Sequence, residues 1–173
     1  MKSINSKNQS PLIKIVFAAL FAALTCVATM AIRVPSPTGY ANLGDCFVLC
    51  SGWVLGPVWG TISAGVGSMF ADIFSGYAYY APATLIIKGL MALAAFYIYK
   101  LLSKKKMVAR IVSAVASECI MIFGYFLFSS LVLGNEIAAA ASSIISDSFQ
   151  GLVGIIVGLA LIKVIEKFKL INM

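Results

Sequence analysis

Long apolar runs leave this chain few ways to fold. It has 173 residues, of which 61% are hydrophobic and 11% charged. A soluble domain has about 45–50% apolar and about 25% charged residues. The composition therefore predicts an all-α integral membrane protein, a single transmembrane domain over residues 1–173. At about 20 residues per membrane-spanning helix, about six helices fit.

Turn-forming residues divide the apolar sequence into six segments. Pro35 and Pro37 stop the first segment, and Gly56–Pro57 makes a break that carries no charge. The first segment is too long for the core of a signal peptide, so we expect a retained helix. The stretch 138–143 is expected to be a loop or a short surface helix. The six predicted helices span residues 12–33, 43–55, 58–74, 82–102, 107–133 and 145–165.

Cations predict how these helices are oriented. Lysine and arginine gather in the N-terminal tail, in the segment 100–110 and in the segment 163–169. Six crossings place all three regions on one side of the membrane, which the excess of positive charge marks as cytoplasmic. We therefore expect both termini to be cytoplasmic in a multi-pass protein of a bacterial plasma membrane. The net charge of +7 is expected to attract anionic lipid headgroups. The sequence has no basic stripe with interleaved aromatic residues, so nucleic-acid binding is not expected.

The residue types argue against an enzyme. The chain has no histidine, no paired-carboxylate motif and no GxxxxGK[ST] phosphate loop. Its four cysteines lie in apolar runs, where small buried hydrophobic side chains are expected rather than a metal or redox site. We expect no catalytic residue, metal or cofactor. Any energy for uphill transport has to come from a partner.

Polar residues within the apolar helices collect in their outer halves. Charges in a membrane span are costly and usually line a bundle interior or a wet cavity, so one cavity open to the outside accounts for them. Asp45 and Asp147 could instead be helix caps or interface residues, and Lys88 could reach a headgroup or pair with Glu118 only to hold the bundle. Asp72 is expected to brace the outer end of its helix, and Arg33 to anchor at the interface. The candidate substrate-binding residues are Thr38, Tyr40, Asn42, Asp45, Tyr80, Lys88, Glu118, Tyr125, Asp147 and Gln150.

The first helix carries a flat face of small residues. Ala18 and Ala22, and likewise Ala19 and Ala23, are spaced four apart. Such faces let helices approach closely without a hydrophobic driving force. The spacing is equally consistent with packing inside the bundle and with docking onto another membrane protein.

Four motifs resemble one family. They are GYANLGD (39–45), LGP (55–57), GVGSMFAD (65–72) and APATLIIKG (81–89). Together with the alanine face, they are similar to the substrate-binding S components of energy-coupling factor (ECF) vitamin transporters, in the family named after its riboflavin members. The resemblance implies capture of a vitamin from outside, docking of the alanine face onto a transmembrane coupling subunit, two cytoplasmic ATPase subunits, and release by toppling.

The substrate is the most open part of the prediction. Hydrogen-bonding groups and both charge signs suit a small polar heterocycle, on whose ring Tyr40 and the tyrosines of 77–80 could stack. A vitamin B6 form or the hydroxymethyl-pyrimidine precursor of thiamin is favoured slightly over riboflavin. A ligand-free structural or regulatory membrane subunit is the alternative. A membrane enzyme acting on lipid is a third, weaker interpretation.

Overall fold

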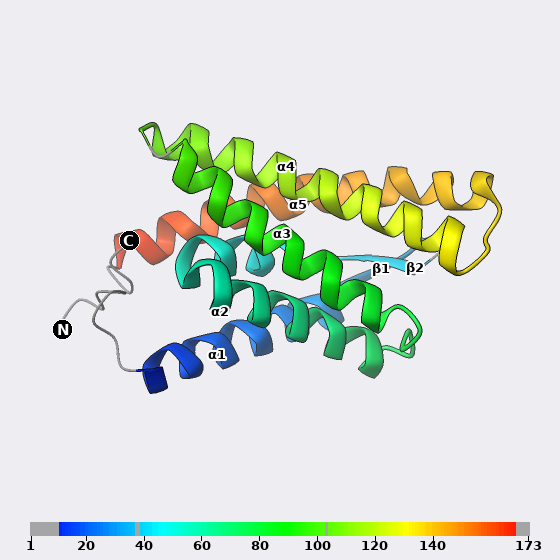
Figure 1. The fold of residues 1–173 in the computed structure, drawn as a ribbon, viewed down its shortest axis with the longest axis horizontal. Coiled ribbons are helices and arrows are strands. Elements are labelled where there is room, and N and C mark those ends of the chain that lie inside the picture. Colours follow the sequence, from blue (N-terminus) through cyan, green and yellow to red (C-terminus); the bar gives the residue numbers. More distant parts are fainter. Residues whose placement is uncertain (1–10, 37–38, 103, 169–173) are drawn as a thin grey trace.

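The computed structural model describes residues 11–36, 39–102 and 104–168. Five long helices lie side by side in an elongated bundle (Figure 1). The start of α1, the α3–α4 connection and the end of α5 lie at one end, called here the termini end. The α2–α3 and α4–α5 connections and the two strands lie toward the other, called the hairpin end. The elements are α1 (Pro11–Ala31), β1 (Arg33–Ser36), β2 (Gly39–Asn42), α2 (Asp45–Phe74), α3 (Ala81–Leu101), α4 (Lys106–Leu127), the π-helical turn η1 (Phe128–Val132) and α5 (Ile137–Lys167).

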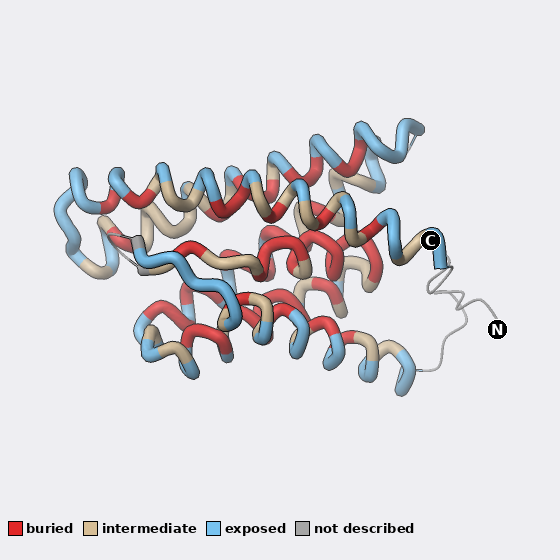
Figure 2. Tube along the Cα trace, turned by 180° about the vertical axis from the view of Figure 1, so that it is seen from behind, coloured by how far each residue is buried: buried red, intermediate tan, exposed pale blue. Residues whose placement is uncertain are grey.

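The outer surface of the bundle is apolar, as a membrane requires. Large hydrophobic side chains on several helices are exposed, among them Leu12, Ile86 and Leu152. Buried positions face the centre of the bundle, and exposed positions lie on the outer faces of the helices (Figure 2). Within the described residues, five helices are long and apolar enough to cross a membrane. The prediction of an all-α membrane protein is confirmed, and the predicted number of six helices is not shown.

The difference in number comes from α2. The predicted helices 43–55 and 58–74 form one element with a kink at Gly56, whose φ of +82° and ψ of −172° lie outside the helical region. The Ser51 hydroxyl lies 3.2 Å from the Gly60 carbonyl oxygen. Nine residues of straight helix would separate these positions by about 13 Å. The two arms of α2 therefore fold back on each other, as Figure 1 shows at the termini end.

The first arm of α2 forms the centre of the bundle. All but one of residues 45–54 are buried. Gly52 lies against the α3 backbone, where an added Cβ would come within 2.3 Å of the Ala92 carbonyl oxygen. The Trp53 indole N–H donates a hydrogen bond of 3.0 Å to the Ser113 hydroxyl on α4. Small residues and one satisfied indole thus let the arm pack closely on α3 and α4.

Three predicted boundaries differ from the structure. The first helix ends at Ala31 rather than 33, because Arg33 begins a two-stranded antiparallel sheet in which it pairs with Asn42. The stretch 138–143 is not a loop, and α5 begins at Ile137 rather than 145. Alanine has the highest helix propensity, which favours continuous helix there. The predicted helix 107–133 is α4 followed by η1.

Candidate functional site

A buried ion pair lies at the centre of the site. Asp45, the first residue of α2, accepts a hydrogen bond from the Lys88 ammonium on α3, and both side chains are almost fully buried. A carboxylate in the first turn of a helix is favoured by the helix dipole. The attraction of Lys88 offsets part of the cost of burying both charges. The interpretations of Asp45 as an interface residue and of Lys88 as reaching a headgroup are therefore wrong.

Gln150 of α5 connects this ion pair to the strands. Its Nε2 donates to Asp45 Oδ2 at 2.6 Å, and its Oε1 accepts from the Asn42 backbone N–H at 2.8 Å. The amide orientation follows from its partners, because a backbone N–H only donates and a carboxylate only accepts. Asn42 in turn accepts a hydrogen bond from the Gly44 N–H at 2.9 Å through its side chain. Three predicted site residues, Asn42, Asp45 and Gln150, thus form one chain of contacts.

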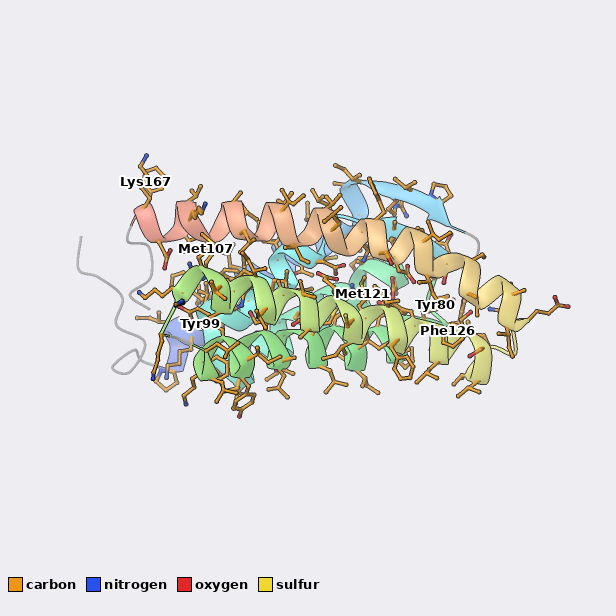
Figure 3. The ribbon with its side chains drawn as sticks, turned by 90° about the horizontal axis from the view of Figure 1, so that it is seen from above. Tyr80, Tyr99, Met107, Met121, Phe126 and Lys167 are labelled. Atoms are coloured by element: carbon orange, nitrogen blue, oxygen red, sulfur yellow. The ribbon has the colours of Figure 1, made fainter. Side chains whose placement is uncertain are left out.

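Met121 and Thr84 belong to the same cluster, although the sequence did not single them out. The Met121 sulfur lies 3.0 Å from Lys88 Nζ and 3.2 Å from Gln150 Nε2, where it acts as a weak acceptor. Lys88 Nζ also lies 5.5 Å from the centroid of the Tyr125 ring. The Tyr125 hydroxyl donates to Thr84 Oγ1 at 3.1 Å. Met121 comes three residues after Glu118 on α4, a spacing that places both on one helix face and was the available signal. Figure 3 shows Met121 inside the bundle.

Glu118 lies beside the ion pair without joining it. Its side chain is 4% exposed, and neither carboxylate oxygen has a hydrogen-bond partner within the described part of the chain. Two glycines of α5 make room for it. A Cβ on Gly151 would lie 3.1 Å from Oε2, and a Cβ on Gly154 would lie 3.2 Å from Oε1 and 2.8 Å from Asp45 Cβ. Because Lys88 pairs with Asp45, the alternative of a Lys88–Glu118 pair is wrong.

The β1–β2 hairpin is fastened to α2 by Tyr40. The Tyr40 hydroxyl donates to Asp72 Oδ1 at 2.7 Å, and its ring lies 5.0 Å from that of Tyr77. Burial, reinforced by the Asp72 carboxylate, raises the pKa of the Tyr40 hydroxyl, so the phenol stays protonated and donates. Asp72 thus braces the end of α2, as predicted, with a partner on β2. Arg33 lies on the other side of Tyr40, with its guanidinium 6.0 Å from the ring centroid.

The remaining predicted residues lie at different distances from this cluster. The Tyr80 ring packs edge-on against the Tyr125 ring, with 6.2 Å between the ring centroids. Tyr80 lies nearer the hairpin end than Met121 (Figure 3). Asp147 is half-buried on α5, one turn before Gln150. Since α5 begins at Ile137, Asp147 does not cap it, and that interpretation is wrong. Thr38 lies outside the described residues.

The alanine face of α1 is divided between two environments. Ala18 is buried and Ala22 half-buried, and an added Cβ on Gly67 of α2 would lie 2.4 Å from the Ala22 carbonyl oxygen. Ala19 and Ala23 are exposed. One pair of alanines therefore serves packing inside the bundle, and the other lies on the outer surface.

A second polar cluster lies at the termini end. Arg110 is buried on α4 and donates two hydrogen bonds to Glu166 of α5, at 2.7 and 3.0 Å. Its guanidinium lies 5.2 Å from the centroid of the Tyr99 ring, which Figure 3 places at this end of the bundle. From the sequence Arg110 counted only as one of the cations that set orientation. Its spacing of three from Ser113 was a signal that it faces inward.

A bundle of apolar helices around a buried polar cluster, with an ion pair and a bridging amide, is typical of multi-pass membrane proteins that bind polar solutes. Residues 10–167 match the family described as ECF-type riboflavin transporter, S component. The chain belongs to this family.

Two further similarities agree with this assignment. An uncharacterised protein of Pyrococcus woesei, encoded in the gap 3′ region, is 30% identical over 143 residues, which cover 82% of this chain and 93% of that protein. A solved S component of a bacterial ECF transporter superposes with a TM-score of 0.77 at 21% identity, covering 92% of this chain and 98% of that one. At this identity the superposition shows the fold.

Membership confirms several predictions from the sequence. The chain is a multi-pass membrane component of a vitamin transporter and not an enzyme. It is the substrate-binding S component, and its partners are in general terms a substrate and the ECF module.

Proposed function

We propose that the chain captures a water-soluble vitamin in a site built around the Asp45–Lys88 ion pair and delivers it to an ECF-type importer. The observation that carries the proposal is the buried polar cluster of Asn42, Asp45, Lys88 and Gln150 in an otherwise apolar bundle. Burying this much polarity is costly in a membrane, and residues that bear this cost are commonly functional. Tyr125 and Tyr80 supply aromatic surface beside the charged groups.

The orientation follows if the two arms of α2 count as separate passes. The chain then runs along the bundle six times in alternating direction, and the start of α1 and the end of α5 lie on the same side (Figure 1). The first arm has about eleven residues before Gly56, or roughly 16 Å of helix. It is too short to cross the roughly 30 Å hydrocarbon core alone and enters from the hairpin end. Lysines near the termini end support a cytoplasmic position for that end, with the hairpin end facing outward. All of these helices belong to one substrate-binding domain.

Riboflavin is the first substrate to test. The family is described by its riboflavin transporters, and the preference for a vitamin B6 form or hydroxymethyl-pyrimidine over riboflavin has no support in that description. The smaller heterocycles therefore become the second group of probes. Lys88 and Gln150 offer donors and Asp45 an acceptor, which any of these polar rings can engage.

Delivery requires a partner surface, and the exposed side of α1 is the best candidate. Ala19 and Ala23 present small side chains outward, and such a face allows close approach of another membrane helix. We propose that the transmembrane coupling subunit docks here, with two cytoplasmic ATPases supplying energy and toppling of the S component releasing the vitamin. Substituting leucine at Ala19 and Ala23 is then expected to abolish assembly with the ECF module while leaving vitamin binding unchanged.

A binding screen tests the central proposal. The purified protein in lipid nanodiscs is titrated with riboflavin, pyridoxine and hydroxymethyl-pyrimidine, and native mass spectrometry identifies any vitamin that copurifies. Saturable binding of one vitamin, lost in Asp45→Asn, supports the proposal. If none of the three binds and no heterocycle copurifies, the alternative of a ligand-free structural or regulatory subunit is preferred, since the ion pair and Gln150 already satisfy one another within the bundle.

A further inference from the structure

Carboxyl groups outnumber cationic groups around the ion pair. Asp45 and Glu118 are both buried, and within the described residues the cation found against them, Lys88, is paired with Asp45. Asp147 adds a third carboxylate, half-buried one turn before Gln150. Arg33 is exposed on the hairpin, and its guanidinium lies over the Tyr40 ring. An anionic ligand would thus meet several carboxyl groups and a cation that is already paired with Asp45, which is an unfavourable environment for it.

Glu118 differs from the other polar groups of the cluster because both of its oxygens lack a partner within the described part of the chain. A buried carboxylate with no hydrogen bond is expensive, and the cost is removed when donors are brought to it. Gly151 and Gly154 leave space for its side chain. A Cβ at either position would lie 3.1 or 3.2 Å from a carboxylate oxygen, which is tighter than most contacts of a real Cβ. The fold thus leaves room for the Glu118 side chain, but the described residues supply no hydrogen-bond donor to its two oxygens.

We infer that Glu118 receives N–H or O–H donors of the substrate, and that the site selects an uncharged or cationic heterocycle and rejects the phosphate ester of the same vitamin. This inference rests on the proposed function and specifies the class of ligand that the site accepts. A donor-bearing ring edge supplies the hydrogen bonds that Glu118 lacks. A phosphate brings a charge of about −1.5 to −2 at neutral pH to a cluster that already holds an excess of carboxylates.

The test compares a vitamin with its phosphate ester. Riboflavin and riboflavin 5′-phosphate are titrated against the full chain in nanodiscs, with pyridoxine and pyridoxine 5′-phosphate as the second pair. The phosphate ester is expected to bind at least about 100-fold more weakly, because like charges brought together in an interface cost several kcal/mol. Glu118→Gln keeps the shape but removes the charge. It is expected to weaken binding of the unphosphorylated vitamin about 10- to 100-fold, the usual size of a hydrogen bond to a charged group.

The ratio of the two dissociation constants is the decisive measurement. In Glu118→Gln the preference for the unphosphorylated vitamin is expected to narrow at least about tenfold, because one of the carboxyl groups that disfavour an anionic ligand is gone. Glu136→Gln is the matched control, since Glu136 is an exposed carboxylate before α5 without a side-chain cap hydrogen bond. It should leave both constants unchanged.

Each outcome decides the inference. If the wild-type protein binds the phosphate ester as tightly as the vitamin, or if Glu118→Gln leaves both constants unchanged, the inference is wrong while the proposed function stands. If the wild-type protein binds neither form of either pair, the inference is wrong, and the proposed function is wrong as well if hydroxymethyl-pyrimidine also fails to bind and no heterocycle copurifies. The wild-type comparison needs no variant, so it remains decisive even if Glu118→Gln fails to fold.

Discussion

Replacing Lys88 by methionine tests the arrangement at the centre of the bundle. The change keeps an unbranched side chain of similar length and removes the charge. Asp45 then keeps its hydrogen bond from Gln150 but loses its cation, and Glu118 beside it has no partner to compensate. Removing one partner of a buried pair costs about 3–5 kcal/mol. Both side chains are nearly inaccessible, at 3% and 0% exposure, so solvent screening does not reduce this figure.

Removing both charges should restore much of the loss. In the double variant Asp45→Asn/Lys88→Met, no unpaired charge remains from the pair, and a neutral replacement of a buried ion pair is often tolerated. The two substitutions are therefore expected to be strongly non-additive, with a coupling energy of about 2 kcal/mol or more. A purely local packing effect at Lys88 would instead add to the effect of Asp45→Asn.

Thermal unfolding in nanodiscs, without added vitamin, measures these effects. A loss of 3–5 kcal/mol corresponds to a fall in melting temperature of about 6–20 °C for a chain of this size. Lys163→Met is the matched control, because Lys163 is exposed on α5. If Lys88→Met lowers the melting temperature no more than Lys163→Met does, Lys88 is not held in a buried pair and the description of the site is wrong.

Three further substitutions test other parts of the fold. Gly56→Ala places a side chain where φ is +82°, so a loss of about 1–3 kcal/mol in thermal unfolding is expected, and an unchanged melting temperature would show that α2 is not kinked there. Tyr40→Phe removes the hydrogen bond to Asp72 and should speed proteolysis within the β-hairpin. The accompanying loss in thermal unfolding should not exceed about 1–3 kcal/mol. An unchanged rate of cleavage would show that this hydrogen bond does not hold the hairpin to α2. Glu166→Gln leaves the buried Arg110 guanidinium without its charged partner and should cost about 1–3 kcal/mol, whereas no effect would show that the pair is open to solvent.

The sequence predicted the class of fold because lipid imposes one strong constraint. Apolar runs long enough to cross a bilayer are visible without any knowledge of packing. The polar residues within them were equally visible, and the structure brings Asn42, Asp45, Lys88 and Gln150 into direct contact. These four residues come from four different elements and meet because the fold brings them to the same depth in the bundle.

What the sequence did not predict depends on tertiary contacts. The Gly56–Pro57 break was recognised, but the way the two arms of α2 fold together depends on packing between Ser51 and Gly60. The pairing of Lys88 with Asp45 rather than Glu118 depends on side-chain geometry that helical spacing does not determine. Arg110 resembled a loop cation because three lysines closely precede it in the sequence, and its burial follows from where α4 begins.

Gln150 has a consequence for how the site opens. Its carbonyl holds the backbone of Asn42 in β2, and its amino group holds Asp45, so one side chain stabilises both the closed hairpin and the ion pair. Lifting the hairpin leaves this carbonyl unsatisfied, and a solute that draws the amide away from Asp45 weakens the attachment of the hairpin. The free energy of opening and the free energy of occupancy are therefore coupled through this residue, and thermodynamic reciprocity makes the coupling equal in both directions. A substitution at Gln150 is expected to reduce this coupling, so that a bound solute changes the opening equilibrium of the hairpin less than it does in the wild-type chain.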